Sequence, residues 1–313
     1  MIEGSYRASF REVRRLAYLR LACDIMAIEK SSEINLASEK FLNKTRTLNW
    51  KLRTYTRNTG KVERISVAKN HFIIAKALGL MKIEGEFVKS TSISAFFASL
   101  LKNDENPFYL SLEEKLSFFE ELFEYKGQDL APLLILFDDE DWIDLGEGIN
   151  RMKIEPRPHV DQIVKSGFDW FVDLGLLSAT SARKGKFGIT RVGKSLREVL
   201  ESSNGSHKSS TLLEVYAEDL LGHIDILDRA DDESIMSSFH KARERTRKFA
   251  TSEISRDLLS ALPIVLFTRL QLLAKYRILL SVDELITHMR ELLPKSGISF
   301  KWDPIYKGGY IRT

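Results

Sequence analysis

The chain of 313 residues contains a single cysteine and no apolar run of the roughly 18 residues that a membrane-spanning helix needs. One cysteine excludes an internal disulfide and a zinc site built from cysteines. Cys23 lies in the apolar run LRLACDIMAI, which favours a small buried hydrophobe over a reactive thiol. The N-terminal stretch MIEGSYRASFREVRR lacks the apolar core of a signal peptide. We therefore expect a cytoplasmic protein that has no membrane partner.

The signatures of common catalytic and cofactor sites are also missing. The sequence has no GxGxxG, GxxxxGKS/T or GxSxG motif, and its histidines form no HExxH or HxxxH pair. The acidic run FDDEDWIDLGEGIN does not have the spacing of an EF-hand loop. We predict no catalytic residue, no metal site and no cofactor, and keep an enzyme of unrecognised type as an alternative.

Charge is unevenly distributed along the chain. The net charge is only +3, but residues 1–110 carry +8 and residues 111–160 carry −8. A basic block followed by an acidic block indicates that different parts of the chain face different partners. The acidic loop at 138–147 is a candidate docking surface for a protein.

One short pattern occurs twice, as Leu78-Gly79-Leu80 and as Leu174-Gly175-Leu176. Each copy follows a helix-prone apolar segment, and each precedes a β-prone hairpin and a further helical segment. The first hairpin, MKIEGEFVKS, turns at Glu84-Gly85, and the second, LLSATSARKGKFGIT, has a longer basic tip. The fold class we predict is mainly α with short β-hairpins.

Both copies and their surroundings resemble the winged-helix (winged helix-turn-helix) superfamily, in the tandem arrangement of bacterial and archaeal proteins. The likeness covers about residues 11–102 and 111–201, with a weaker likeness at 255–313. It implies that the helix before each hairpin, or wing, is a recognition helix and that a basic wing contacts the DNA backbone.

This reading divides the chain into four parts. We predict a basic winged-helix unit at 1–107, a second unit at 108–201 with an acidic N-terminal part and a basic wing, a linker at 202–210, and a helical region at 211–313. In the last region we expect helices at 211–229, 233–250, 254–279 and 282–293, and then a third winged-helix-like unit. The third unit has no Leu-Gly-Leu junction and no closing helix.

A basic segment gives the best nucleic-acid signal. Between Lys40 and Lys76 ten basic residues stand against one acidic residue, Glu63. The second wing and the start of the next helix are also basic, with no acidic residue between 183 and 197. The residues predicted to contact DNA are Lys44, Arg46, Lys51, Arg53, Arg57, Lys61, Arg64, Lys69, Asn70, Gln162, Lys165, Arg183, Lys184, Lys186 and Arg191.

Other features limit this prediction. Glu84 and Glu86 at the first wing tip would repel phosphates, so the first unit should use its helices. Asp161, Asp169 and Asp173 on the second pre-wing helix argue against base reading by the second unit.

The hypothesis is a non-catalytic, nucleoid-associated protein that binds double-stranded DNA. It would be a transcription regulator or the DNA-reading subunit of a defence or genome-maintenance system. The alternative is a protein-protein assembly subunit of the kind that binds the kleisin of chromosome-organising ATPases, because tandem winged helices also serve as protein-binding modules. A homodimer stays open. The basic run HKARERTRK, at 240–248, fits an intramolecular salt-bridged face at least as well as a third DNA contact.

Overall fold

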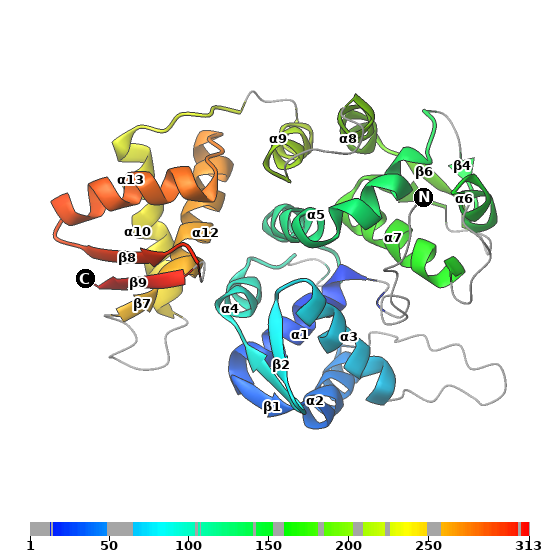
Figure 1. The fold of residues 1–313 in the computed structure, drawn as a ribbon, viewed down its shortest axis with the longest axis horizontal. Helices are drawn as coiled ribbons and strands as arrows, with labels where there is room; N and C mark the ends of the chain where they lie inside the picture. Colours follow the sequence, from blue (N-terminus) through cyan, green and yellow to red (C-terminus); the bar gives the residue numbers. More distant parts are fainter. Residues whose placement is uncertain are drawn as a thin grey trace. The chain divides into compact units, whose positions relative to one another are not determined.

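The computed structural model describes residues 13, 15–48, 65–103, 106, 108–139, 142–152, 160–180, 185–202, 209–222, 226–248, 258–305 and 308–312, except for the side chains of 160–163, 209–210 and 248. Within these residues the protein is mainly α-helical and contains three antiparallel sheets of three strands each (Figure 1). The predicted fold class is confirmed. Two compact units divide the chain, residues 1–220 and residues 221–313.

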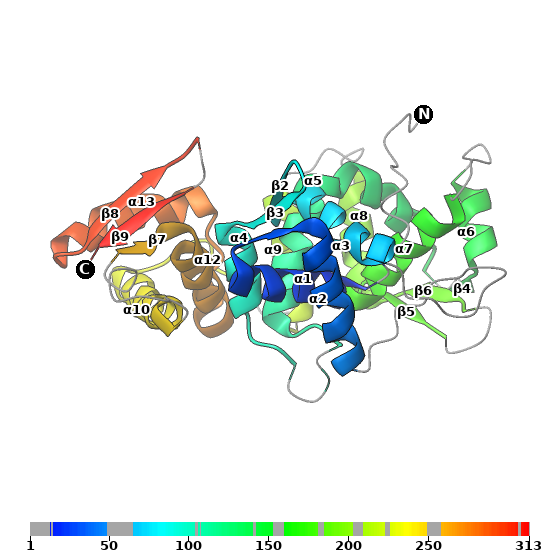
Figure 2. The same cartoon turned by 90° about the horizontal axis from the view of Figure 1, so that it is seen from below.

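The first winged-helix-like unit is built around helix α1. Its elements are α1 (Leu16–Glu29), β1 (Ser31–Glu33), α2 (Ile34–Thr47), α3 (Ile65–Ala77), β2 (Met81–Glu84), β3 (Phe87–Ser90) and α4 (Ser92–Ser99). Helix α1 is apolar around most of its circumference and is buried from Leu16 to Cys23, because α2, α3 and α4 all pack against it (Figure 2). Helix α2 ends at Thr47, with Leu48 as its C-cap.

The second winged-helix-like unit follows the same order. Its elements are α5 (Leu112–Ile135), β4 (Trp142–Ile143), α6 (Leu145–Arg151), α7 (Val160–Leu174), β5 (Leu177–Ala179), β6 (Phe187–Ile189) and α8 (Arg191–Ser202). Ser111 begins α5 with a capping box, in which its hydroxyl accepts from the Glu114 N–H and Glu114 accepts from the Ser111 N–H. The three-residue spacing of Ser111 and Glu114 in the sequence is that of a capping box.

The C-terminal unit repeats the order a third time. Its elements are α10 (Asp232–Lys248), β7 (Leu258–Ser260), α12 (Ala261–Gln271), the π-helical turn η2 (Leu272–Tyr276), α13 (Val282–Lys295), β8 (Ser299–Asp303) and β9 (Gly308–Arg312). In all three units the last strand lies between the first two, as β1-β3-β2, β4-β6-β5 and β7-β9-β8. The chain thus contains three helical units, each with a small sheet, consistent with tandem winged-helix-like units. Strand β7 lies where a continuous helix over 254–279 was expected, so that prediction was wrong.

The same glycine junction joins the third helix to the hairpin in each unit. Gly79, Gly175 and Gly297 have φ of +69°, +80° and +74°, a left-handed conformation that glycine adopts without a Cβ clash. The next N–H reaches back to a helix carbonyl, from Leu80 to Ala75, from Leu176 to Phe171 and from Ile298 to Leu293. In the third unit Ser296-Gly297-Ile298 therefore takes the place of Leu-Gly-Leu. As expected, the third unit lacks the Leu-Gly-Leu sequence. It nevertheless has the same backbone geometry at the junction.

A threonine after each of the first two hairpins forms hydrogen bonds that connect the hairpin to the closing helix. The Thr91 hydroxyl donates to the Leu80 carbonyl at 2.7 Å and accepts from the Ser94 N–H at 3.1 Å. The Thr190 hydroxyl lies 2.7 Å from the Gly175 carbonyl oxygen and 2.9 Å from that of Leu176, and it accepts from the Gly193 N–H at 3.1 Å. Each threonine thus caps the closing helix and ties it to the glycine junction.

Helix α9 (Ser209–Leu220) belongs to the first compact unit. It packs on α5 and α8. Tyr216 is fully buried, stacks on Phe119 at 4.1 Å between ring centroids, and donates to the Leu174 carbonyl at 2.7 Å. The predicted boundaries at 107 and 201 stay predictions.

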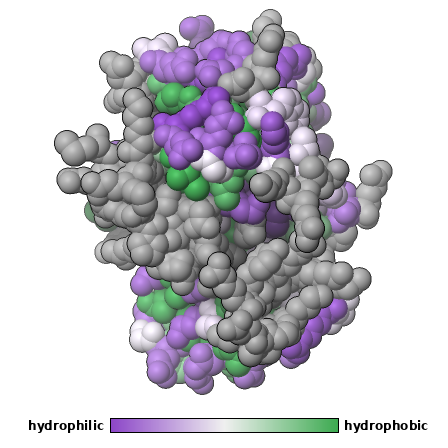
Figure 3. Space-filling model, turned by 90° about the vertical axis from the view of Figure 1, so that its right-hand side faces the viewer, coloured by the Kyte–Doolittle hydropathy of each residue, from purple (hydrophilic) through white to green (hydrophobic). Residues whose placement is uncertain are grey.

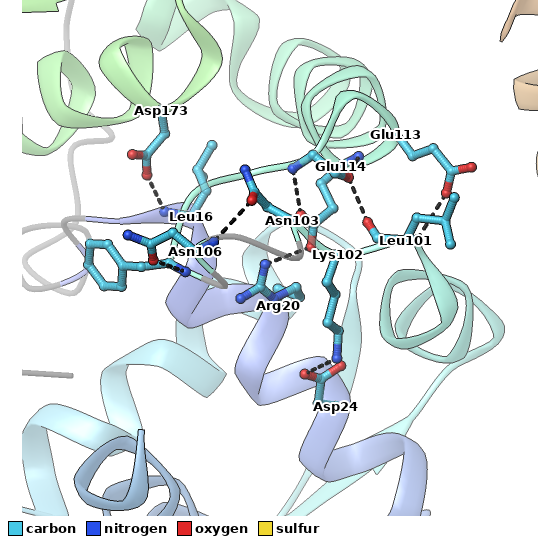
Figure 4. A network of polar contacts seen from close by, with 12 residues as sticks. Leu16, Arg20, Asp24, Leu101, Lys102, Asn103, Asn106, Glu113, Glu114 and Asp173 are labelled. Carbon is cyan, nitrogen blue, oxygen red and sulfur yellow. Dashed lines mark hydrogen bonds and ion pairs between the residues drawn. The ribbon is translucent and has the colours of Figure 1, made fainter. Parts of the chain in front are cut away.

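Buried polar contacts join the first two winged-helix-like units (Figure 4). Arg20 of α1 donates to Glu114 of α5 at 2.8 Å, and both side chains are almost completely buried. Lys102 pairs with Asp24 at 2.7 Å, nearer the surface. A buried ion pair that loses one partner is costly, so the Arg20–Glu114 pair fixes how α1 and α5 sit together.

Candidate nucleic-acid interface

Helix α3 presents a polar stripe outside the core of the first unit. Ala68, Phe72 and Ala75 are buried on one face. On the other side, residues at helical spacing are exposed or half-buried, and they are Ser66, Lys69, Asn70, Ile73, Lys76 and Ala77. No acidic residue occurs in α3. Lys69 and Asn70, predicted from the sequence as recognition residues, therefore lie on an accessible face.

The last turn of α2 adds positive charge. Lys44 and Arg46 are exposed there, as predicted, and α2 packs on α3. Cations in a last turn also stabilise the helix by interacting with its dipole, so their position by itself does not require DNA. Lys40 is different, because its Nζ pairs with Glu29 at 2.6 Å.

Several predicted contacts lie outside the described residues. They are Lys51, Arg53, Arg57, Lys61 and Arg64 between α2 and α3, and Arg183 and Lys184 in the second wing. Gln162 is placed in α7 by its backbone, and its side chain is not described. These assignments stay predictions.

Helix α7 occupies in the second unit the position that α3 has in the first, but it is enclosed. Among its described side chains, 164–174, none is exposed. Lys165 is half-buried, with its Nζ 5.6 Å from the centroid of the Phe187 ring on the wing. The predicted recognition residue Lys165 thus faces the wing of its own unit.

The N-terminal segment of the chain covers one side of α7. The Trp170 indole donates to the Val13 carbonyl at 2.9 Å. Asp173 accepts from the Leu16 N–H at 2.8 Å, at the start of α1, and from Arg15 at 2.6 Å. Burial raises the pKa of Asp173 to about 6, while Arg15 and the Leu16 N–H act in the opposite direction. Asp173, which argued against base reading, has a role in binding α1.

Two glycines allow the close packing of α7. A Cβ on Gly167 would lie 2.4 Å from Leu133 Cδ1 of α5. A Cβ on Gly148 of α6 would lie 2.9 Å from the Phe168 ring of α7. Larger residues at these positions would push the helices apart.

The second wing has a mixed surface. Lys186 and Arg191 are exposed, as expected for backbone contacts. Strand β4, which the sequence does not reveal, adds Trp142, and its indole covers Gly188, whose Cβ would lie 2.9 Å from the ring. Trp142 is 46% exposed, so it extends the wing surface with an aromatic face.

In the first wing a lysine and a glutamate pair with each other. Lys89 of β3 donates to Glu84 of β2, and this hydrogen bond lowers the pKa of Glu84. The pair leaves little positive charge at the tip. This arrangement agrees with a role for the helices of this unit in any DNA contact.

The acidic loop is tied to the end of α5. Arg151 donates to the Leu136 carbonyl and pairs with Asp138 at 3.2 Å. Arg197 donates to the Phe137 carbonyl and pairs with Asp139 at 2.7 Å. These arginines thus pair with the carbonyls of the two residues that follow α5. The loop thus has a structural role, and its role in partner binding stays a prediction.

In the described part of the chain no cluster of three His, Cys, Asp or Glu side chains could hold a metal ion. Over the same residues, no helix is both long and apolar enough to cross a bilayer. On the face drawn in Figure 3 the coloured atoms are mostly hydrophilic, and hydrophobic ones lie in small patches. No protein-family model, curated protein or solved structure matches the chain.

Proposed function

We propose that this protein binds double-stranded DNA through its first winged-helix-like unit. The observation that carries the proposal is the accessible stripe of α3, which contains Lys69, Asn70 and Lys76 and no carboxylate. A helix of this kind can enter the major groove, where side chains contact base edges and phosphates. The exposed Lys44 and Arg46 on α2 extend the positive surface.

The segment between α2 and α3 supports the same proposal. Residues 49–64 contain five basic residues and one acidic residue in sequence. Lys186 and Arg191 of the second unit would add contacts to phosphates, whereas the enclosed helix α7 would not read bases. Binding of this kind suits a transcription regulator or the DNA-reading subunit of a larger system.

The test is fluorescence anisotropy of the full-length protein with a labelled DNA duplex over a series of salt concentrations. The double variant Lys44→Glu and Lys69→Glu should weaken binding by about tenfold or more at low salt and flatten the salt dependence. The control is Lys295→Glu with Lys301→Glu, because both lysines are exposed and lie in the other compact unit. Undetectable binding at low salt, or equal effects of the two double variants, would contradict the proposal.

A matched pair of single variants tests the role of α3 directly. Lys69 and Lys165 stand at equivalent positions, ten residues before Gly79 and Gly175. Lys69→Ala should reduce affinity several-fold, since it removes a phosphate or base contact, and Lys165→Ala should change it less than about twofold. The reverse order would assign DNA recognition to the second unit.

A second candidate function is supported by one observation. Helix α7, the third helix of the second unit, contacts Val13 and Arg15 of the same chain. The helix in this position is therefore already used for a contact with protein. That use favours an assembly subunit of the kleisin-binding type as the alternative. Absence of DNA binding together with a defined complex on pull-down from the native host would favour it.

A further inference from the structure

The C-terminal unit contains an unusual turn between its second and third helices. Residues Leu272–Tyr276 form a π-helical turn, and Arg277 follows in the left-handed region with φ of +61°. The Arg277 carbonyl accepts from the Leu227 N–H at 2.8 Å, and Leu227 pairs with Ile278 in a parallel bridge. These bonds hold the turn in place. Single π-turns in helices occur frequently at functional sites.

Four polar groups meet at this turn. The exposed Lys275 donates from Nζ to the Tyr276 hydroxyl at 2.5 Å. Helix α10 packs against the π-helical turn, and its residues Ser237 and Lys241 lie one helical turn apart on the same face. Ser237 hydrogen-bonds to the same tyrosine, and Lys241 acts on it electrostatically. Together these groups lower the pKa of Tyr276. Hydrogen bonds therefore join the Tyr276 hydroxyl to Lys275 and Ser237, and Lys241 adds a second positive charge from α10.

The acidic residues at the start of α10 are engaged at the helix N-terminus. Asp231 is the cap of the helix, where it accepts from the Ser234 N–H at 2.6 Å. Asp232 and Glu233 lie in the first turn, where the helix dipole favours negative charge. Among the described residues no ion pair of Lys241 or Lys275 is found within 4 Å. The salt-bridged face that the sequence suggested for 240–248 is therefore not observed at Lys241.

We propose that Ser237, Lys241, Lys275 and Tyr276 form a phosphate-binding site for the backbone of a nucleic acid. A phosphodiester oxygen accepts hydrogen bonds and carries negative charge, so it matches two ammonium groups and two hydroxyl donors. In the absence of a phosphate, the Tyr276 oxygen accepts from Lys275. With a phosphate present, both groups would donate to it instead. This inference rests on the proposed function, because it gives the C-terminal unit a second contact with the same DNA.

The first experiment measures the salt dependence of DNA binding by the full-length protein. The double variant Lys241→Ala and Lys275→Ala should lower the slope of log affinity against log salt by about two, since it removes two contacts with phosphates. Tyr276→Phe should weaken binding two- to threefold and leave the slope unchanged. The control is Lys295→Ala with Lys301→Ala, both exposed lysines of the same unit.

The outcomes separate this site from the proposed function. An unchanged slope for Lys241→Ala with Lys275→Ala, alongside weak binding by Lys44→Glu with Lys69→Glu, would overturn the site and leave the function standing. Equal slope changes in the variant and its control would overturn the site as well. Thermal melting followed by circular dichroism checks that each variant is folded.

A second experiment does not depend on DNA. Pyrophosphate is titrated into the protein while the ultraviolet absorbance of phenolate is followed against pH, with Tyr276→Phe as the reference. A bound anion offsets the lysine charges, so it should raise the pH at which Tyr276 ionises. A shift without any effect on the DNA salt slope would overturn the nucleic-acid assignment in favour of a small phosphate compound. No shift and no slope effect would overturn the site altogether.

Discussion

Helices α3 and α7 follow the same plan in sequence and have opposite surroundings. Both end at a Leu-Gly-Leu junction, and both have a lysine and a phenylalanine at equivalent positions, Lys69 with Phe72 and Lys165 with Phe168. On one side of α3 the residues Lys76 and Ala77 are exposed, whereas none of the described side chains of α7 is exposed. Helix α7 is contacted by α5 and α6 and by Val13.

Three further pairs of equivalent residues explain this difference. Ala77 is exposed in α3, and its counterpart Asp173 binds the start of α1. Ile74 is buried in the core of its own unit, and its counterpart Trp170 donates to the chain before α1. The buried His71 corresponds to Gly167, which lets Leu133 approach. Two helices with one topological position can thus differ in how far they are buried, depending on three side chains.

The largest expected effect concerns the pH dependence of stability, where the two helices act in opposite directions. Burial lowers the pKa of His71 to about 4, between the Tyr18 and Phe41 rings. The unfolded chain binds this proton near pH 6.5, so stability is lost as the pH falls from 6.5 through 4, by about 3 kcal/mol. The raised pKa of Asp173, about 6, means that stability is lost as the pH rises from about 4 through 6, by a similar amount.

Single variants should reveal the two opposing contributions. His71→Phe should give a protein whose stability rises as the pH falls from 6 to 4, and Asp173→Asn one whose stability drops over that range. Urea unfolding at a series of pH values measures both. Parallel pH profiles for the two variants would contradict the comparison, and His240→Phe, an exposed histidine, is the control.

The next effect compares the closing helices. Gly193 and Ser94 are equivalent, but a Cβ on Gly193 would lie 2.2 Å from the Leu176 carbonyl oxygen. Because that atom belongs to the backbone, Gly193→Ala should cost about 2 to 3 kcal/mol of unfolding free energy. Ser94→Gly should cost about 1 kcal/mol through the lost capping box. Chemical denaturation measures both, and a neutral Gly193→Ala would show that α8 can move away from the junction.

The smallest effect should be the same in both units. Thr91 and Thr190 make the same bonds to their junctions and closing helices. Replacing either one by valine keeps the shape and removes the hydroxyl, which should cost about 1 kcal/mol. Differential scanning calorimetry of Thr91→Val and Thr190→Val should show similar decreases in melting temperature. A large difference between the two decreases in melting temperature would mean that Thr91 and Thr190 do not have equivalent roles.

Much of the local structure could be predicted from the sequence. The helix-prone segments before the two Leu-Gly-Leu copies correspond to α3 and α7, and the glycines of those copies mark the start of the first two hairpins. Strands β1, β4 and β7 were missed because each is short and forms no hairpin with a neighbouring strand, so no turn marks it in the sequence. They exist because the last strand of each hairpin supplies pairing partners far away in the chain.

The third unit shows a second limit of sequence reasoning. Its junction uses Ser296 and Ile298 in place of leucines, so a search for repeated letters overlooks it. What the third junction shares with the other two is a positive φ, at Gly297, and a buried apolar residue directly after the glycine. The Tyr276 cluster was also beyond prediction, because Lys241 of α10 and Lys275 of the π-helical turn lie 34 positions apart in sequence.

The sequence by itself determined the helices, the glycine junctions and the basic segment, because these depend on periodicity, on one left-handed residue and on composition. Only the tertiary structure decided which third helix is accessible. Burial of α7 results from contacts between residues about 157 positions apart, such as Trp170 with Val13 and Asp173 with Leu16. No local pattern encodes such contacts, since they form only when separate units pack together.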